Sequence, residues 1–206
     1  MFARRVYESL ASGTPVISND SVGVRQLFGD IVIMAGEHSI TDQLKALEAS
    51  SKTYDMLARR GVRAVMREHT YGHRIQALCH LLGIKVDVAL PKGTLAMTVR
   101  SEADIHRAKQ LFESQTAKCK HLFIELENFE TACRFLNQSN DNVTYAMQLS
   151  NKLYTSEFKY YGTSLILKHD VNTPLAAEAL EDYIYWGGGS KRVVQTHDVG
   201  EEEVSL

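Results

Sequence analysis

The sequence predicts an α/β protein built from Rossmann-like αβα layers around parallel sheets. Short apolar runs alternate with longer segments in which apolar residues recur at helical spacing, and this order is typical of strands alternating with helices. The run at 30–35 is apolar almost throughout, as in a parallel strand that is covered on both faces. Repeated strand–helix–strand order implies parallel strands joined by right-handed crossovers.

Length and composition are those of a globular chain with one large or two small domains. The chain has 206 residues, of which 44% are hydrophobic, and a formal net charge of −2. This charge gives no general attraction to nucleic acid or to an anionic membrane. The sequence has no apolar run of membrane-spanning length and no signal-peptide core, so we expect a cytoplasmic protein. Cys79, Cys119 and Cys133 are few and widely spaced, which favours buried free thiols over disulfides or a metal site.

Helical periodicity and turn residues divide the first part of the chain into short elements. Gly13 and Gly83 follow apolar stripes at helical spacing, where a residue able to adopt positive φ ends a helix. Ser39 and Thr70 stand directly before further stripes and are expected to cap those helices. The predicted helices cover 3–12, 22–28, 39–50, 52–68 and 71–82, and the predicted strands cover 15–18 and 30–35.

A domain boundary is predicted between residues 84 and 85, just past Gly83. Residues 85–186 are expected to form a second α/β unit, because strand and helix patterns alternate again. Residues 187–206 are expected to be a glycine-rich linker and an acidic tail, with an edge strand at 192–195. The predicted strands of the second unit cover 85–90, 95–99, 120–126, 143–147 and the apolar run 163–168, and its predicted helices cover 101–114, 130–137 and 174–185.

The stretch from Tyr7 to Asn19 is the strongest candidate for a binding site. A helix is expected to end at Gly13, the chain to turn at Thr14-Pro15, and a short buried strand to follow. The strand ends in a run of short polar residues that begins at Ser18. Ligands of open α/β sheets bind beyond the carboxyl ends of the strands, so a site is expected here.

This stretch and three other segments resemble the nucleotide-sugar-binding region of retaining GT-B glycosyltransferases, in the branch of spore-maturation-type glycosyltransferase-like proteins. The segments are 2–7, 7–19, 23–30 and 69–74, so the resemblance covers roughly residues 1–84. In that family a glutamate on this helix hydrogen-bonds the donor ribose, and Glu8 is the matching residue. The resemblance implies a nucleotide-diphosphate sugar as the donor substrate, with no cofactor and no metal. The donor-binding residues that it implies are Glu8, Arg5, Gly13, Thr14, Ser18 and Asn19.

Each of these features also has a purely structural interpretation. Glu8 can be a solvated helix glutamate beside Arg4 or Arg5, and the Gly-Thr-Pro turn can be an ordinary helix stop. His69 and His73 have the four-residue spacing of metal ligands on a helix. Because Thr70 is expected to cap a helix between them and no third ligand is evident, a metal site is not expected there.

The second unit resembles the start of a family-two, GT-A-type glycosyltransferase over roughly residues 94–186. The resemblance rests on a strand followed by Arg100-Ser101-Glu102, a helix that leads to Gln115-Thr116, and the strand 122–126. Glu125 and Glu127-Asn128 fit only loosely the acidic residues that hold the nucleobase in that family. The segment 151–162 lacks the family's Asp-x-Asp pair, so metal-dependent transfer is not expected.

The function predicted from these resemblances is transfer of a sugar from a nucleotide-diphosphate donor to a glycan, lipid or protein acceptor. The GT-B-type unit would begin before Met1, so we expect two incomplete glycosyltransferase-like units and a piece of a longer enzyme. The alternative is a non-catalytic fragment or interaction module derived from a glycosyltransferase. The expected partners are a nucleotide sugar and, as an open alternative, a partner chain or a second copy that completes the sheet, but no nucleic acid.

Overall fold

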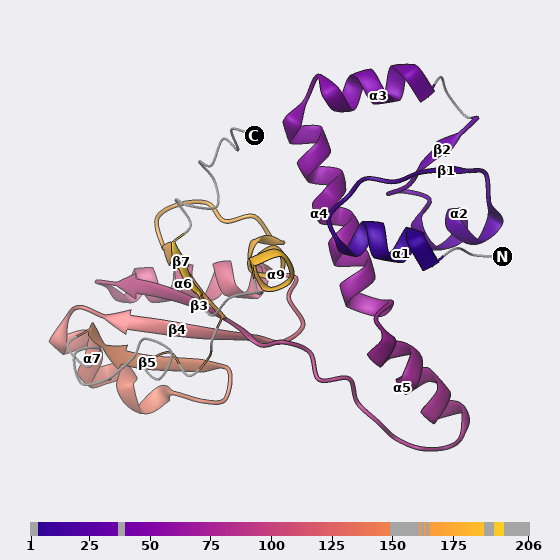
Figure 1. Ribbon diagram of the computed structural model, residues 1–206. Helices are drawn as coiled ribbons and strands as arrows, with labels where there is room; N and C mark the ends of the chain where they lie inside the picture. Colours follow the sequence, from indigo (N-terminus) through magenta and orange to yellow (C-terminus); the bar gives the residue numbers. More distant parts are fainter. Residues whose placement is uncertain are drawn as a thin grey trace. The chain divides into compact units, whose positions relative to one another are not determined.

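The computed structural model describes residues 4–36, 40–148, 161, 163, 165–187 and 192–195. All of its described strands pair in parallel, and helices separate most of them along the chain, which confirms the predicted α/β class. The chain forms two compact units, residues 1–89 and 90–206 (Figure 1). The assignment of these units to parts of particular glycosyltransferase folds stays a prediction.

The first unit consists of short strands and longer helices. Strand β1 pairs in parallel with β2, and Ile17 lies opposite Ile33. Thr70 caps α5 as predicted, since its hydroxyl accepts a hydrogen bond from the amide of His73. The elements are α1 (Arg4–Ala11), β1 (Ile17–Asn19), α2 (Val22–Phe28), β2 (Ile33–Ala35), α3 (Ile40–Glu48), α4 (Ser51–Glu68) and α5 (Tyr71–Leu81).

The core of the first unit depends on a close contact between α1 and α4. Leu10 of α1 is 1% exposed and packs against Gly61 of α4. A Cβ atom at Gly61 would lie 2.9 Å from Leu10 Cδ2, so the missing side chain allows this approach. Tyr7, Phe28 and His69 form an edge-to-face ring cluster beside this contact, with centroids 5.1–5.6 Å apart. The helix α1, which carries the predicted donor-binding residue Glu8, is therefore packed firmly against α4 and Phe28.

The second unit is a five-stranded parallel sheet with helices between its strands. The strand order is β5-β4-β3-β6-β7, so the first strand of this unit lies in the middle of the sheet. The capping box that Ser101 and Asp104 form begins α6, as the sequence pattern indicates. The elements are β3 (Gly93–Val99), α6 (Glu102–Ser114), β4 (Lys120–Leu126), α7 (Phe129–Phe135), a 3-10 turn (Leu136–Gln138), β5 (Val143–Met147), β6 (Leu165–Asp170), α9 (Ala179–Asp182), a π-helical turn (Tyr183–Gly187) and β7 (Arg192–Gln195).

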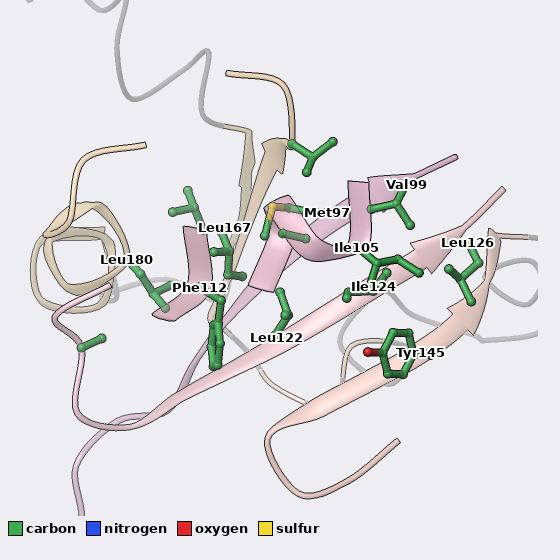
Figure 2. Packing of buried hydrophobic residues seen from close by; sticks show 14 of the residues in the cluster. Met97, Val99, Ile105, Phe112, Leu122, Ile124, Leu126, Tyr145, Leu167 and Leu180 are labelled. Carbon is green, nitrogen blue, oxygen red and sulfur yellow. The ribbon is translucent and has the colours of Figure 1, made fainter. Parts of the chain in front are cut away.

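The two faces of this sheet differ in chemistry. Alternate side chains of a strand point to opposite faces, and Leu95, Met97 and Val99 share one face of β3. This face packs with α6, α7 and α9 into the main core, and Figure 2 shows Met97 in the same cluster as Ile105 and Phe112 of α6. The opposite face carries Thr94, Ala96 and Thr98 on β3 and polar residues on the neighbouring strands. Among the described residues, the buried apolar part of that face is a small cluster of Ala96, Phe123, Ile166 and Tyr161.

The Gln115-Thr116 pair that contributed to the GT-A resemblance packs against the segment that leads into α9. The Gln115 amide group donates to the carbonyl of Ala176 at 3.0 Å and accepts from the amide of Leu180 at 3.0 Å. The Thr116 hydroxyl donates to the Glu181 carboxylate at 2.6 Å, and the Thr116 amide donates to the carbonyl of Ala177. Gln115 and Glu181 are both buried, so this pair has a structural role in the sheet's helical cover.

Several predicted elements differ from those observed. Residues 85–90 form no strand, although their apolar residues alternate, and Val86 is exposed. The last helix begins at Ala179 rather than Pro174, because residues 174–176 have no regular structure and 177–178 form a turn. Ser50 caps α4, a role that the sequence analysis did not assign. The cysteines are free as expected, but none is buried and Cys133 is exposed. The predicted cap Ser39, the segment 151–160, the linker 188–190 and the acidic tail lie outside the described residues.

Candidate functional site

The predicted donor-binding glutamate lies on the exposed side of α1. Glu8 Oε1 is 2.7 Å from Arg4 Nε, one helical turn away, and 55% of the Glu8 side chain is exposed. Exposed ion pairs of this kind contribute little to stability, so the carboxylate can exchange Arg4 for a ligand at small cost. Arg5 is also exposed on α1. Glu8 therefore forms the ion pair with Arg4 that a purely structural role predicts. It is also accessible enough to bind a ligand.

The turn after α1 has the expected left-handed glycine. Gly13 has φ of 74°, which favours glycine at this helix end. The amides of Gly13 and Thr14 donate to the carbonyls of Leu10 and Ser9 at 3.1 and 2.9 Å. Both N–H groups are thus engaged within the turn, so a ligand at this position would meet the Thr14 side chain rather than a row of amides.

The strand that follows has the short polar residues at its carboxyl end, as predicted, but it is not buried, since Ile17 is 37% exposed. The hydroxyl of Ser18 donates to the carbonyl of Asn19 at 3.0 Å. Asp20, next along the chain, accepts from the guanidinium of Arg25 at 2.9 and 3.2 Å. Asn19 is exposed at the end of β1. The six predicted donor-binding residues therefore lie on α1, on the turn after it and on β1, and the ligand that they would hold stays a prediction.

A second site, which the sequence analysis did not propose, lies in the second unit at the carboxyl ends of β3, β4 and β6. It is a cavity of about 360 Å³, and the residues that line it include Thr98, Glu125 and Asp170. The chain runs from β3 to β4 and β5 on one side and then returns to place β6 on the other side of β3. Such a reversal in strand order is where open α/β sheets bind their ligands.

The strand register places the central polar side chains of the cavity in one row. Thr98 pairs with Glu125 on one side and with Asp170 on the other. Glu125 is 8% exposed, and its carboxylate accepts from the hydroxyls of Thr98 at 3.0 Å and Tyr161 at 2.9 Å. These two hydrogen bonds fix the orientation of the buried carboxylate at the cavity wall. Both donors are neutral hydroxyls, so neither bond neutralises its charge.

Charged groups from the β3–α6 loop, from the first turn of α6 and from the residue after β4 also line the cavity. Arg100 Nε lies 2.6 Å from Glu127 Oε2, and this hydrogen bond raises the pKa of Arg100. The Asp104 carboxylate accepts from the amides of Arg100 and Ser101 at 3.2 and 3.0 Å and pairs with Arg107. Hydrogen bonding from Arg107 is the largest cause that lowers the pKa of Asp104, to about 2. The amides of Arg100 and Ser101 therefore already donate to Asp104. They are not available to bind an anion at the start of α6.

Lys168 and His169 on β6 complete the polar wall of the cavity. Lys168 Nζ lies 5.4 Å from the centroid of the Tyr161 ring, a cation–π distance. His169 is buried, and its Nε2 is 3.0 Å from the carbonyl oxygen of Thr173. Tyr161 is thus in contact with both a carboxylate and an ammonium group.

Among the described residues, no group of three or more His, Cys, Asp and Glu side chains is placed to hold a metal ion. No described helix is both long enough and apolar enough to cross a membrane.

The comparison with known families bears on the first unit. Residues 1–80 match the family described as glycosyl transferase-like. That part of the chain is similar to glycosyltransferases. The glycosyltransferase-like segment, residues 1–80, contains Glu8, Gly13, Thr14 and the end of β1, and this supports the general relationship predicted from its motifs. No curated protein and no solved structure matches the chain. The finer GT-B and GT-A assignments stay predictions.

The cavity of the second unit lies outside the glycosyltransferase-like segment. The sequence does contain its signal, since Glu125 and Glu127 directly follow the apolar run Leu122–Ile124 of β4. The order of the strands, with β3 at the centre of the sheet, brings Glu125, Thr98 and Asp170 together, and this order is not evident from the local pattern of residues.

Proposed function

We propose that the chain takes part in glycosyl transfer and that its first unit binds a nucleotide-diphosphate sugar, whose sugar passes to a glycan, lipid or protein acceptor. The observation that carries this proposal is the match of residues 1–80 to the glycosyl transferase-like family. It is supported by the position of Glu8, which is exposed on the helix where the resemblance expects a ribose ligand.

In this proposal the residues of the first unit bind and orient the donor. The Glu8 carboxylate would accept hydrogen bonds from the ribose hydroxyls in place of the Arg4 guanidinium. Arg5, Gly13 and Thr14 would lie near the donor, together with Ser18 and Asn19 at the end of β1. Catalysis in this branch rests on positioning and on stabilising the leaving diphosphate rather than on a metal ion.

The test is donor binding to variants of Glu8. Glu8→Ala removes charge-assisted hydrogen bonds worth roughly 1.5–3 kcal/mol, so the affinity for the donor should fall about ten- to a hundredfold. The affinity of Glu8→Gln for the donor should lie between those of Glu8→Ala and the natural chain, because glutamine keeps one acceptor and loses the charge. Isothermal titration calorimetry with uridine and guanosine diphosphate sugars at millimolar concentration measures both effects.

Two further variants separate binding from folding. Glu48→Ala removes an exposed carboxylate at the end of α3 and should leave both donor affinity and melting temperature unchanged. Leu10→Ala opens the packed contact with Gly61 and should cost about 2–5 kcal/mol of stability. If Glu8→Ala binds every donor as tightly as the natural chain, or if no donor binds to the natural chain, the proposal is wrong.

A second candidate function is a non-catalytic interaction module. The observation that favours it is the sheet of the first unit, which within the described residues contains only β1 and β2. A two-stranded sheet leaves strand edges unpaired, so a partner chain or a second copy of this chain would extend it. Release of nucleoside diphosphate from a donor in the presence of mixed glycan acceptors would decide for the enzyme, and donor binding without release would decide for the module.

A further inference from the structure

We propose that the cavity in the second unit is a separate binding site for a neutral ligand with neighbouring hydroxyl groups, the chemistry shared by sugars and by the ribose of a nucleoside. The cavity lies where the strand order reverses around β3, at the carboxyl ends of three adjacent strands. Its position follows from the topology of the sheet, and it involves no residue of the glycosyltransferase-like segment.

The acceptor groups of the cavity suit hydroxyl donors. Each oxygen of the Glu125 carboxylate accepts one hydrogen bond from the protein, from Thr98 or from Tyr161. An ionised carboxylate oxygen has a second lone pair, so each can accept one more hydrogen bond from a ligand. Asp170 lies two strands away in the same register row, separated from Glu125 by Thr98. Two hydroxyl groups on adjacent ring carbons match a carboxylate that presents two oxygens at one edge.

Burial strengthens these interactions. Glu125 is 8% exposed, and hydrogen bonds to an ionised group are stronger where water is largely excluded. Thr98 and Tyr161 fix the carboxylate before a ligand arrives, which reduces the conformational entropy that binding would cost. The second unit therefore presents an oriented acceptor pair rather than a flexible surface glutamate.

The charges around the cavity argue against a phosphate-bearing ligand. The lining includes four carboxylates (Asp104, Glu125, Glu127 and Asp170) and the cations Arg100 and Lys168. Arg100 is paired with Glu127, and the amides of Arg100 and Ser101 at the start of α6 already donate to Asp104. A diphosphate would meet an excess of negative charge and would find these amides occupied. A neutral hydroxylated ligand meets neither obstacle.

The role of such a ligand rests on the proposed function. If the first unit binds the nucleotide sugar, a neutral sugar in the second unit would be part of the acceptor. The binding site itself does not depend on that role, and its test uses different residues and different probes.

The experiment is an NMR titration of the ¹⁵N-labelled full chain with glucose, uridine and uridine diphosphate at millimolar concentrations. We expect saturable shifts of the amide signals of Thr98, Glu125 and Asp170 with glucose, with uridine or with both. Glucose alone identifies a sugar site, and uridine alone identifies a nucleoside site. Uridine diphosphate should bind more weakly than uridine at these residues. The proposal is overturned if neither neutral probe gives saturable shifts there, or if uridine diphosphate binds more tightly than uridine.

Variants of the second unit test the assigned acceptor. Glu125→Gln keeps the shape of the side chain and loses its charge, so the affinity for the neutral probe should fall about tenfold or more. Glu130→Gln changes an exposed carboxylate of α7 outside the cavity and should leave the affinity unchanged. If Glu125→Gln fails to give a folded spectrum, Asp170→Asn takes its place, with the same loss expected. Unchanged affinity in a folded variant contradicts the proposal, whereas the response of donor binding to Glu8→Ala is unaffected by this outcome.

Discussion

At the scale of single residues, Asp104 shows how one carboxylate connects local structure to charge. It closes the capping box of α6, accepts from two backbone amides and pairs with Arg107. Hydrogen bonding, from Arg107 first, lowers the pKa of Asp104 from 3.8 to about 2. Because the folded state favours the charged form, Asp104 stabilises the fold fully above about pH 4, and this contribution is lost as the pH falls toward about 2.

Asp104→Asn should therefore destabilise the chain in a pH-dependent way. At pH 7 we expect a loss of about 1 kcal/mol in the free energy of unfolding, the usual value of a helix cap. The difference between variant and natural chain should stay constant from pH 7 to pH 5 and shrink below about pH 4. Urea denaturation at several pH values measures it. A difference that is the same at pH 3 and pH 7 would contradict the assigned pKa.

Single residues also show what could and could not be predicted from the sequence. The cap Thr70 and the helix-ending Gly13 depend on neighbours within a few positions, and both were predicted. The partners of Glu125 are Thr98 and Tyr161, which lie 27 and 36 positions away in the sequence. Such contacts depend on strand order and register, which local pattern does not specify, and the cavity of the second unit was therefore missed.

At the scale of elements, the presence of helices and buried strands was predicted better than the residues at which they begin and end. The strands β4 and β5 have the predicted limits, because each has apolar residues at its centre and irregular segments on both sides. The alternating pattern at 85–90 predicted a strand where the chain has no regular structure. Alternation only favours a strand when a neighbouring strand can pair with it, and no described strand does so here. The late start of α9 has a similar cause, since the hydrogen bonds to Gln115 and Thr116 hold residues 176 and 177 outside the helix.

The contact between Gln115 and the start of α9 leads to a second stability prediction. Gln115 is 3% exposed, and Gln115→Ala would leave the Ala176 carbonyl and the Leu180 amide without these partners. We expect a loss of about 1–3 kcal/mol, because the buried amide of Leu180 loses its partner, whereas the carbonyl of Ala176 still accepts from the amide of Ala179. Gln110→Ala, at an exposed position of α6, should change stability by less than about 0.5 kcal/mol. Chemical denaturation compares the two, and equal stabilities would show that the contact is dispensable.

At the scale of the whole molecule, the chain is divided near residue 89. Residues 84–92 have no helix or strand, and Lys85 is exposed. Backbone without regular hydrogen bonds is more accessible to a protease than backbone within helices. The predicted fold class could be derived from the sequence because it depends only on the order of elements. The strands that belong to each sheet, and their order in it, could not be derived from the sequence. The same succession of elements along the chain is compatible with several strand orders.

Limited trypsinolysis tests this division. Among the cleavage sites between residues 4 and 148, we expect the first cut at Lys85, ahead of the arginines inside α4. Mass spectrometry of the early fragments identifies the site, and Lys85→Gln should slow their appearance. First cuts within α4 or α6 would show that the helices open more readily than the segment 84–92.

The central position of β3 also has a consequence for synthesis of the protein on the ribosome. Of the five strands in its sheet β3 is made first, yet one of its edges pairs with β6, which begins at Leu165. The 66 residues from Val99 to Leu165 take roughly 3–13 s to add at ordinary translation rates. Throughout that interval the apolar strand Gly93–Val99 has an unpaired edge, which is the kind of surface that aggregates or recruits chaperones. The strand order that creates the cavity thus leaves one edge of β3 unpaired in the nascent chain until β6 has been made.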